Sequence, residues 1–182
     1  YTGSAYAGLN TYASRRAGTR PPPLEKTDPK KEKRLEDGLK LFDDQHVKET
    51  TDWMVICRGM SPNEMHNLVY RYETGKDVET NNPDDKKLTD HIGKTAVFPT
   101  LTSTSLTGDY SGFGSVKVHL LVPPGTRGVY ADYLTDGSAM SIHAGEREYI
   151  LPPGVKFEIL DVKMKKDTKD SYDRIYARII PE

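Results

Sequence analysis

Two glutamates separated by one residue form the most informative pattern in the chain. Glu146 and Glu148 stand just ahead of the apolar residues 149–151. Because alternate residues of a strand point to the same face, a strand through this segment would present both carboxylates to one site. Like charges this close raise one another's pKa unless a cation or a hydrogen bond intervenes. The pair therefore suits a site that binds a cation or stabilises one in a transition state, although such pairs also occur on solvated strand edges.

An arginine ends an apolar run much earlier in the chain. Arg58 closes residues 52–58, which predict a buried strand, and Gly59 follows it. We therefore expect the guanidinium to emerge at the sheet edge. A guanidinium fork suits bidentate binding of phosphate. The alternative is a structural ion pair with one of the two paired glutamates.

A cluster of hydroxyls lies between the arginine and the glutamates. Ser103, Thr104 and Ser105 follow one another, and a strand would turn Ser103 and Ser105 to one side and Thr104 to the other. Hydroxyls on a strand can simply satisfy backbone groups. If they face the carboxylates, they would orient and ionise one of them.

The elements that must position these residues fall into two compositional halves. Residues 1–95 are polar and mainly helical in pattern, with helices expected over 1–13, 28–48 and 61–72, the last with Ser61 as N-cap and Glu64 closing a capping box. Residues 96–182 are mainly β in pattern, with short strands expected over 96–98, 116–122, 128–130, 149–151, 155–162 and 174–180. Helices followed by many short strands predict an α+β fold with packed, mostly antiparallel sheets. The 182 residues fit a single domain over 1–182.

Composition narrows the classes of function. The net charge of −1 gives no sign of a nucleic-acid or membrane-surface binder. One cysteine and five scattered histidines predict neither a disulfide framework nor a metal site. No apolar run approaches the roughly 20 residues that cross a bilayer. The chain starts at Tyr1 without a secretory signal, which favours a domain cut from a longer precursor.

Three motifs carry a resemblance to a known family, in this order along the chain: Arg58-Gly59, Ser103-Thr104-Ser105 and Glu146-x-Glu148. Together they resemble the arginine–serine–glutamate class of mono-ADP-ribosyltransferases, which includes bacterial toxins and phage enzymes. Residues 1–12, 122–130 and 149–157 are also similar to that family, so the resemblance spans nearly the whole chain. It implies N-terminal helices packed on two mostly antiparallel β-sheets around a central NAD-binding cleft.

The resemblance implies NAD⁺ as co-substrate, with no metal. Breaking the bond to nicotinamide leaves a cationic ribose, and a nearby carboxylate stabilises that charge. Glu148 would take this role and bind a ribose hydroxyl, while Ser103 would hold Glu148 in place. Arg58 would bind the NAD⁺ phosphates, and the backbone of Gly59 would clamp the nicotinamide amide.

Further residues receive roles from the same resemblance. Thr104 and Ser105 would support the dinucleotide pocket, and Phe113 would stack on nicotinamide, with Tyr110 as the competing aromatic. Similar toxins often carry an arginine where this chain has Val116. The neighbouring Lys117 is the candidate replacement for that phosphate contact.

Glu146 concerns the acceptor. Members of the class with a glutamate at this position usually modify arginine, and a carboxylate can bind a guanidinium and help to deprotonate it. The implied partner is therefore a protein modified on arginine, with residues 135–145 presenting a surface to it. We expect a secreted or delivered toxin domain whose delivery domain or subunit lies outside this chain.

Two other functions remain open. An NAD⁺ glycohydrolase would use the same glutamate with water as acceptor. A catalytically inactive interaction module would keep the fold and bind a partner. The presence of Arg58, Ser103, Glu146 and Glu148 favours the transferase.

Overall fold

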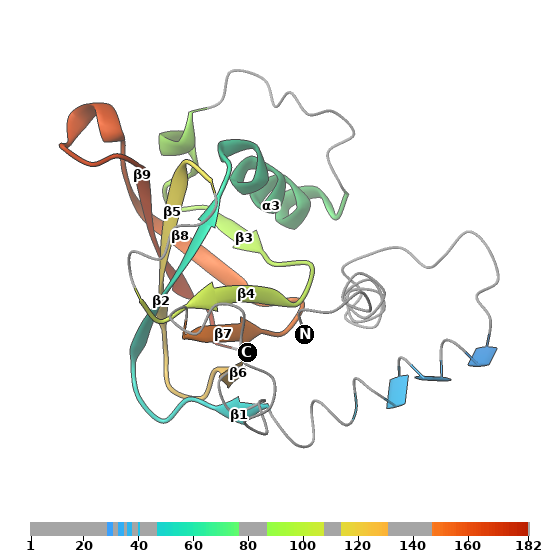
Figure 1. The fold of residues 1–182 in the computed structure, drawn as a ribbon. Coiled ribbons are helices and arrows are strands. Elements are labelled where there is room, and N and C mark those ends of the chain that lie inside the picture. The colour runs from blue at the N-terminus through green and yellow to red at the C-terminus, as the bar shows by residue number, and fades with distance from the viewer. Residues whose placement is uncertain are drawn as a thin grey trace.

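The structure is a computed structural model that describes residues 29–30, 33–34, 36–37, 40, 47–76, 87–107, 114–130 and 147–181 (Figure 1). Its elements, in chain order, are β1 (Lys48–Glu49), β2 (Met54–Met60), α3 (Pro62–Thr74), η1 (Leu88–His91), β3 (Thr95–Val97), β4 (Thr102–Ser105), β5 (Val116–Val122), β6 (Arg127–Tyr130), β7 (Glu148–Leu151), β8 (Lys156–Lys163), η3 (Lys165–Asp167) and β9 (Asp173–Ile179). The α+β class is therefore confirmed.

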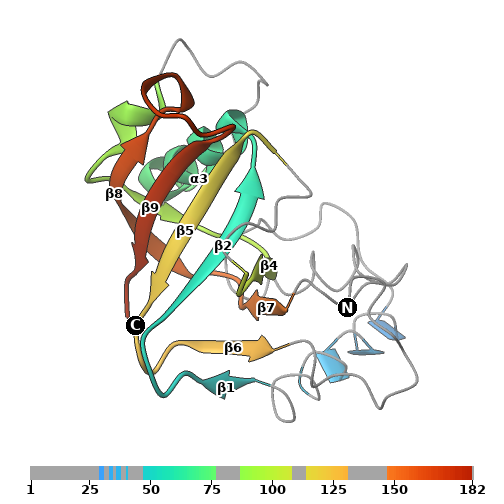
Figure 2. The same ribbon diagram turned by 60° about the vertical axis from the view of Figure 1, so that its left-hand side comes forward.

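The strands of the described residues form one mixed sheet, and the prediction of two sheets is wrong. Their order is β1-β6-β7-β4-β2-β5-β9-β8-β3, and β5 and β9 are parallel whereas the other pairs are antiparallel. β2 and β4 share a single register pair, Cys57 with Ser105. In Figures 1 and 2, β4, β7, β6 and β1 lie across the lower part of the molecule, while β2, β5, β9 and β8 run steeply beside them. One backbone pair thus joins two differently oriented groups of strands.

The strands follow the expected alternation, with corrections at their ends. β5 has the predicted bounds, and its alternate residues Val116, Val118, Leu120 and Val122 are fully buried. β2 continues past Arg58 to Met60. The prediction that residues 52–58 are buried throughout is wrong, because the side chains of Trp53 and Val55 are 58% and 51% exposed.

The helix α3 begins and ends where its capping residues predict. The hydroxyl of Ser61 accepts a hydrogen bond from the backbone N–H of Glu64 at 3.1 Å, and Pro62 occupies the first turn. Gly75 ends the helix in the left-handed conformation, with φ of 70°. The carboxylate of Glu64, which the sequence predicts to close a capping box, bonds to Arg58.

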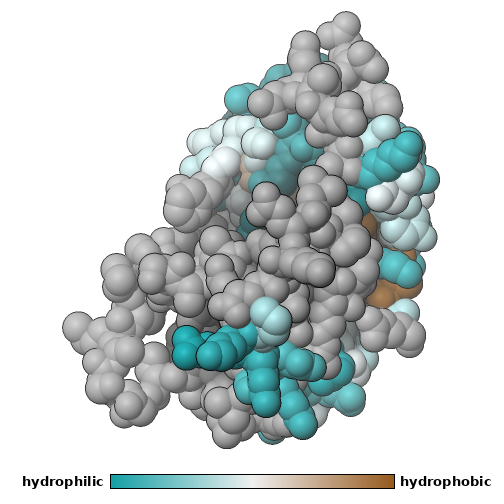
Figure 3. Space-filling view, turned by 90° about the vertical axis from the view of Figure 1, so that its right-hand side faces the viewer, coloured by the Kyte–Doolittle hydropathy of each residue, from teal (hydrophilic) through white to brown (hydrophobic). Residues whose placement is uncertain are grey.

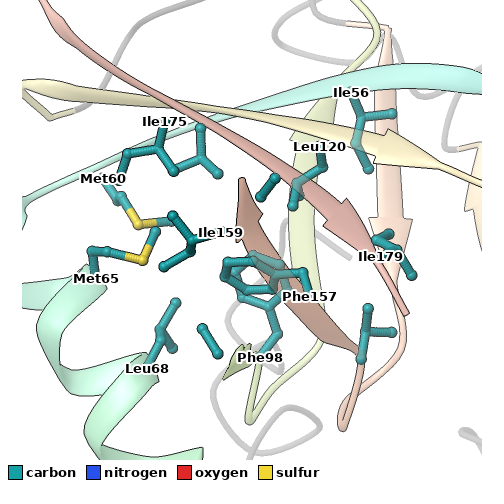
Figure 4. Close-up of a cluster of buried hydrophobic side chains, with 14 of the residues drawn as sticks. Ile56, Met60, Met65, Leu68, Phe98, Leu120, Phe157, Ile159, Ile175 and Ile179 are labelled. Atoms are coloured by element: carbon teal, nitrogen blue, oxygen red, sulfur yellow. The ribbon is translucent and has the colours of Figure 1, made fainter. Parts of the chain in front are cut away.

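The hydrophobic core lies between α3 and the sheet (Figure 4). Met65 and Leu68 project from α3 toward Met60, Ile159 and Ile175 of the strands. The rings of Phe98 and Phe157 pack with centroids 4.7 Å apart. This packing fixes α3 relative to β2, and both elements carry residues of the candidate site.

Two predictions fall on segments outside the described residues: the helix over 1–13 and the surface over 135–145. Positions 29, 30, 33, 34, 36, 37 and 40 are helical and exposed, as the predicted second helix requires. Its predicted end at Lys48 is wrong, because Lys48 and Glu49 pair with β6. On the face in Figure 3, most of the described residues that are visible are hydrophilic.

No helix among the described residues is long and apolar enough to span a membrane. Within the same residues, no group of three or more histidine, cysteine, aspartate or glutamate side chains could hold a metal ion.

Candidate active site

Ser103 and Glu148 meet across two neighbouring strands. β4 and β7 are antiparallel, with Ser103 opposite Ile150 and Ser105 opposite Glu148. Ser103 and Glu148 are therefore diagonal neighbours on one face. The hydroxyl of Ser103 donates to Oε1 of Glu148 at 2.5 Å, and both residues are half-buried. A serine that donates to a carboxylate orients it.

Arg58 contacts the same serine from the other side. Its Nη1 donates to the backbone carbonyl of Ser103 at 2.8 Å, and its Nη2 donates to Oε1 of Glu64 at 3.1 Å. The expected position at the sheet edge is wrong, because β2 lies between β4 and β5. An ion pair, the alternative role, is present, but its partner is Glu64 of α3 and not Glu146 or Glu148 as expected.

Sequence reasoning missed Glu64 as a site residue. Six positions separate it from Arg58, and the interval contains the end of β2, the cap at Ser61 and the first turn of α3. A strand, a tight connection and an acidic first helical turn could have pointed to this pair. The result is a continuous chain of contacts from Glu64 through Arg58 and Ser103 to Glu148.

Arg147 separates the two glutamates in an unusual conformation. β7 begins at Glu148, and Arg147 has a φ of 45°, in the left-handed region that side-chain-bearing residues seldom adopt. Its carbonyl accepts from the backbone N–H of Leu106 at 3.1 Å. The regular strand geometry of β7 therefore begins after Arg147. Glu146 itself lies outside the described residues.

The remaining hydroxyls of the motif make contacts within the protein. Thr104 is buried and donates to the backbone carbonyl of Tyr149 at 2.6 Å, so it ties β4 to β7. The hydroxyl of Ser105 lies 2.7 Å from that of Thr107. Gly59 lies in β2, opposite Lys117 of β5.

The residues proposed to surround nicotinamide are only partly described. Phe113 and Tyr110 lie outside the described residues. Gly114, which follows them, has a φ of 77°, and a Cβ there would come within 2.1 Å of the carbonyl oxygen of Met60. The backbone at Gly114 therefore lies against Met60 at the end of β2, two residues beyond Arg58.

Lys117 does not lie beside Arg58. Arg58 is opposite Val118 in the β2–β5 ladder, so Lys117 occupies the other face of the sheet. Its side chain is buried, and Nζ lies 4.7 Å from the centroid of the Tyr172 ring. Val116 is in the core. This geometry argues against Lys117 as the replacement phosphate ligand.

Tyr149 anchors β7 next to Glu148. Its side chain packs against Gly128, where an added Cβ would come within 2.3 Å of the phenolic oxygen. That oxygen is buried and has no hydrogen-bond partner among the described residues, and burial raises the pKa of Tyr149 to about 12. The residue after the candidate catalytic glutamate is therefore tightly packed.

This arrangement is the fold of the bacterial ADP-ribosyltransferase toxins. C3larvin toxin from Paenibacillus larvae matches with a TM-score of 0.59 at 19% identity, over 96% of this chain and 81% of that one. The ADP-ribosylating toxin BECa of a C. perfringens binary enterotoxin, solved with NADH, matches with a TM-score of 0.60 at 18% identity, over 99% of this chain and 41% of that one. C3stau2 from S. aureus with NAD matches with a TM-score of 0.59 at 14% identity, over 100% of this chain and 89% of that one.

The family model for the ADP-ribosyltransferase exoenzymes matches residues 1–180, and the chain belongs to this family. The resemblance seen in the three motifs is thereby confirmed at the level of the family. No curated protein sequence matches the chain. The arginine–serine–glutamate class and the roles of individual site residues stay predictions.

Proposed function

We propose that the protein transfers ADP-ribose from NAD⁺ to an arginine of a target protein and releases nicotinamide. The observation that carries this proposal is the hydrogen bond between Ser103 and Glu148, together with the contact of Arg58 to the same serine. These are the residues to which the resemblance assigns NAD⁺ binding and stabilisation of the cationic ribose.

The surroundings of Glu148 support a carboxylate that faces a ribose. Oε1 of Glu148 accepts a hydrogen bond from Ser103. Oε2 accepts none from the described residues. The side chain is half-buried, so its charge interacts with a nearby cation more strongly than it would in bulk water. When the bond to nicotinamide breaks, this charge stabilises the cationic ribose, and Oε2 binds a ribose hydroxyl.

Arg58 keeps donors for a phosphate after its internal contacts. A guanidinium has five N–H groups, and single bonds to Ser103 and Glu64 leave hydrogens on both terminal nitrogens. The side chain is 29% exposed. We assign to it one phosphate of NAD⁺, to the Gly59 backbone the nicotinamide amide and to Phe113 the stacking contact.

Glu146 determines the acceptor in this proposal. A carboxylate binds the guanidinium of the target and accepts its proton as the arginine attacks the ribose. An amide at the same position cannot act as a base. Exchange of Glu146 for glutamine therefore separates arginine transfer from NAD⁺ cleavage.

The test uses labelled NAD⁺ with three readouts: release of nicotinamide in water, labelling of agmatine and labelling of proteins in a host-cell lysate. We expect Glu148→Gln to lower all three by about a hundredfold or more. Glu146→Gln should keep nicotinamide release and lose agmatine labelling. The control is Glu158→Gln, a partly exposed carboxylate on β8 that pairs with Arg178.

Each alternative gives a different result. Nicotinamide release without any labelled acceptor identifies a glycohydrolase, and a wild-type protein that cleaves no NAD⁺ is an inactive module. Equal loss of both reactions in Glu146→Gln contradicts the role assigned to that residue. Mass spectrometry of the labelled lysate protein identifies the target and the modified residue.

A delivery component completes the proposal. BECa belongs to a binary enterotoxin, and the present chain spans 41% of it. We infer that this domain reaches its target inside a host cell through a separate domain or subunit.

A further inference from the structure

The first turn of α3 carries a carboxylate that the proposed reaction does not use. Glu64 is held in place by the cap at Ser61, whose hydroxyl accepts from its backbone N–H. Its side chain is 39% exposed, and Oε1 lies 3.1 Å from Nη2 of Arg58. The first turn of α3, six residues after Arg58, therefore places a hydrogen-bond acceptor beside the guanidinium.

Two contacts in different directions fix the orientation of the Arg58 fork. Nη2 bonds to Glu64 on α3, and Nη1 bonds to the carbonyl of Ser103 on β4. A guanidinium is planar and rigid, so two bonded nitrogens define its plane. Removal of the Glu64 side chain would leave the guanidinium with the contact to Ser103 but without the contact to α3.

The hydrogen bond from Arg58 to Ser103 connects β2 and β4 where few backbone pairs join them. β2 and β4 share only the pair Cys57 with Ser105. The carbonyl of Ser103, two residues along, receives the side chain of Arg58. The guanidinium thus holds β4 where the ladder to β2 is short.

We propose that Glu64 is a positioning residue for Glu148, acting through Arg58 and Ser103. The carbonyl that accepts from Arg58 and the hydroxyl that donates to Glu148 belong to one residue, so a shift of that residue moves the carboxylate. This inference rests on the function proposed above. Small displacements of a reacting group lower the rate of a reaction strongly.

A purely electrostatic role for Glu64 predicts the opposite behaviour. If its negative charge only neutralised Arg58, loss of the charge would strengthen the binding of anionic phosphates and lower KM for NAD⁺. The substitution Glu64→Gln keeps an acceptor oxygen without the charge, whereas Glu64→Ala removes both. The two substitutions therefore separate acceptance of a hydrogen bond from charge.

The experiment measures kcat and KM for NAD⁺ in nicotinamide release and in agmatine transfer. Glu64→Ala should lower kcat by about three- to tenfold in both reactions, because both depend on Glu148, with KM within about twofold of wild type. Glu64→Gln should keep at least about half of the wild-type kcat. The control is Glu73→Ala, which removes a carboxylate of similar exposure, paired with Lys94, from the other end of the same helix.

Circular dichroism at the assay temperature verifies that each variant is folded. If Glu64→Ala does not fold, Glu64→Asp keeps the charge and shortens the arm, and it should lower kcat in the same way. Unchanged kcat in Glu64→Ala, or equal losses in Glu64→Gln and Glu64→Ala, overturns the inference while the wild type remains active. A wild-type protein that cleaves no NAD⁺ overturns the proposed function and this inference with it.

Discussion

The hydroxyl of Ser103 donates to Oε1 of Glu148 at 2.5 Å, although 45 positions separate the two residues in the chain. The antiparallel pairing of β4 and β7 brings them together, because Ser105 lies opposite Glu148 and Ser103 is its diagonal neighbour. The carbonyl of the same serine accepts from Arg58. Ser103 therefore contacts both Arg58 and Glu148.

Ser103→Ala should lower kcat for NAD⁺ cleavage by about ten- to a hundredfold, because Glu148 loses a hydrogen bond donated to its charge. The half-buried position should keep the effect on thermal stability small. Thr74→Ala serves as control, since it removes an exposed hydroxyl that bonds to the carbonyl of Tyr70 at the end of α3. Equal kcat values in the two variants would refute a role for the serine.

Arg58→Lys should lower the free energy of unfolding by about 1–2 kcal/mol and also reduce activity. An ammonium cannot reproduce the planar fork that reaches Ser103 and Glu64 together. Urea unfolding measures the loss. The control is Arg178→Lys, an exposed pair with Glu158, which should change stability by less than about 0.5 kcal/mol.

Arg147→Val should destabilise the protein by about 1–2 kcal/mol and lower kcat, because a β-branched side chain tolerates the φ of 45° poorly. Arg147→Asn removes the same charge, and asparagine accepts this backbone region more readily. Both variants lack the charge, so the difference between them in thermal unfolding and in NAD⁺ cleavage measures the cost of the left-handed backbone conformation at residue 147. Identical behaviour would show that the charge of Arg147 is what matters.

Tyr149→Phe should raise stability at neutral pH by about 1 kcal/mol, because the phenolic oxygen is buried and no described residue hydrogen-bonds to it. It should also change the response to alkaline pH. Burial raises the pKa of Tyr149 from 10.0 to about 12, so the unfolded chain loses this proton first. Between pH 10 and 12 the wild type should therefore lose about 1–2 kcal/mol of stability through this residue.

Unfolding of Tyr149→Phe and wild type across that pH range measures the effect. Tyr70→Phe, which alters an exposed tyrosine of α3, should retain the alkaline loss of the wild type. If the free energy of unfolding falls with pH as steeply in Tyr149→Phe as in wild type, the alkaline loss does not come from Tyr149.

Much of the local structure could be predicted from sequence. Ser61, Pro62 and Gly75 delimit α3 through capping preferences that act within a few residues. The alternation of Val116 and its neighbours predicts β5 with its observed bounds. The order of the three motifs correctly indicates the family. These signals depend on residue types and on short spacings along the chain.

Three features of the site could not be predicted in this way. The sheet is continuous because of one backbone pair, Cys57 with Ser105. Lys117 falls on the face opposite Arg58 because of the β2–β5 register, and a shift of one residue would reverse that. Arg147 has a left-handed backbone directly before β7, and its residue type does not signal that conformation.

The sequence by itself determined which residues are present for the chemistry, where α3 begins and ends, and which residues of β5 face the core, because these follow from preferences local to each segment. Only the tertiary structure decided that Ser103 bonds to Glu148, that Arg58 is held between Glu64 and Ser103, and that β2 joins β4 at one position. Strand pairing and ion pairs depend on contacts between distant segments, and many registers satisfy the same local pattern until the core packs.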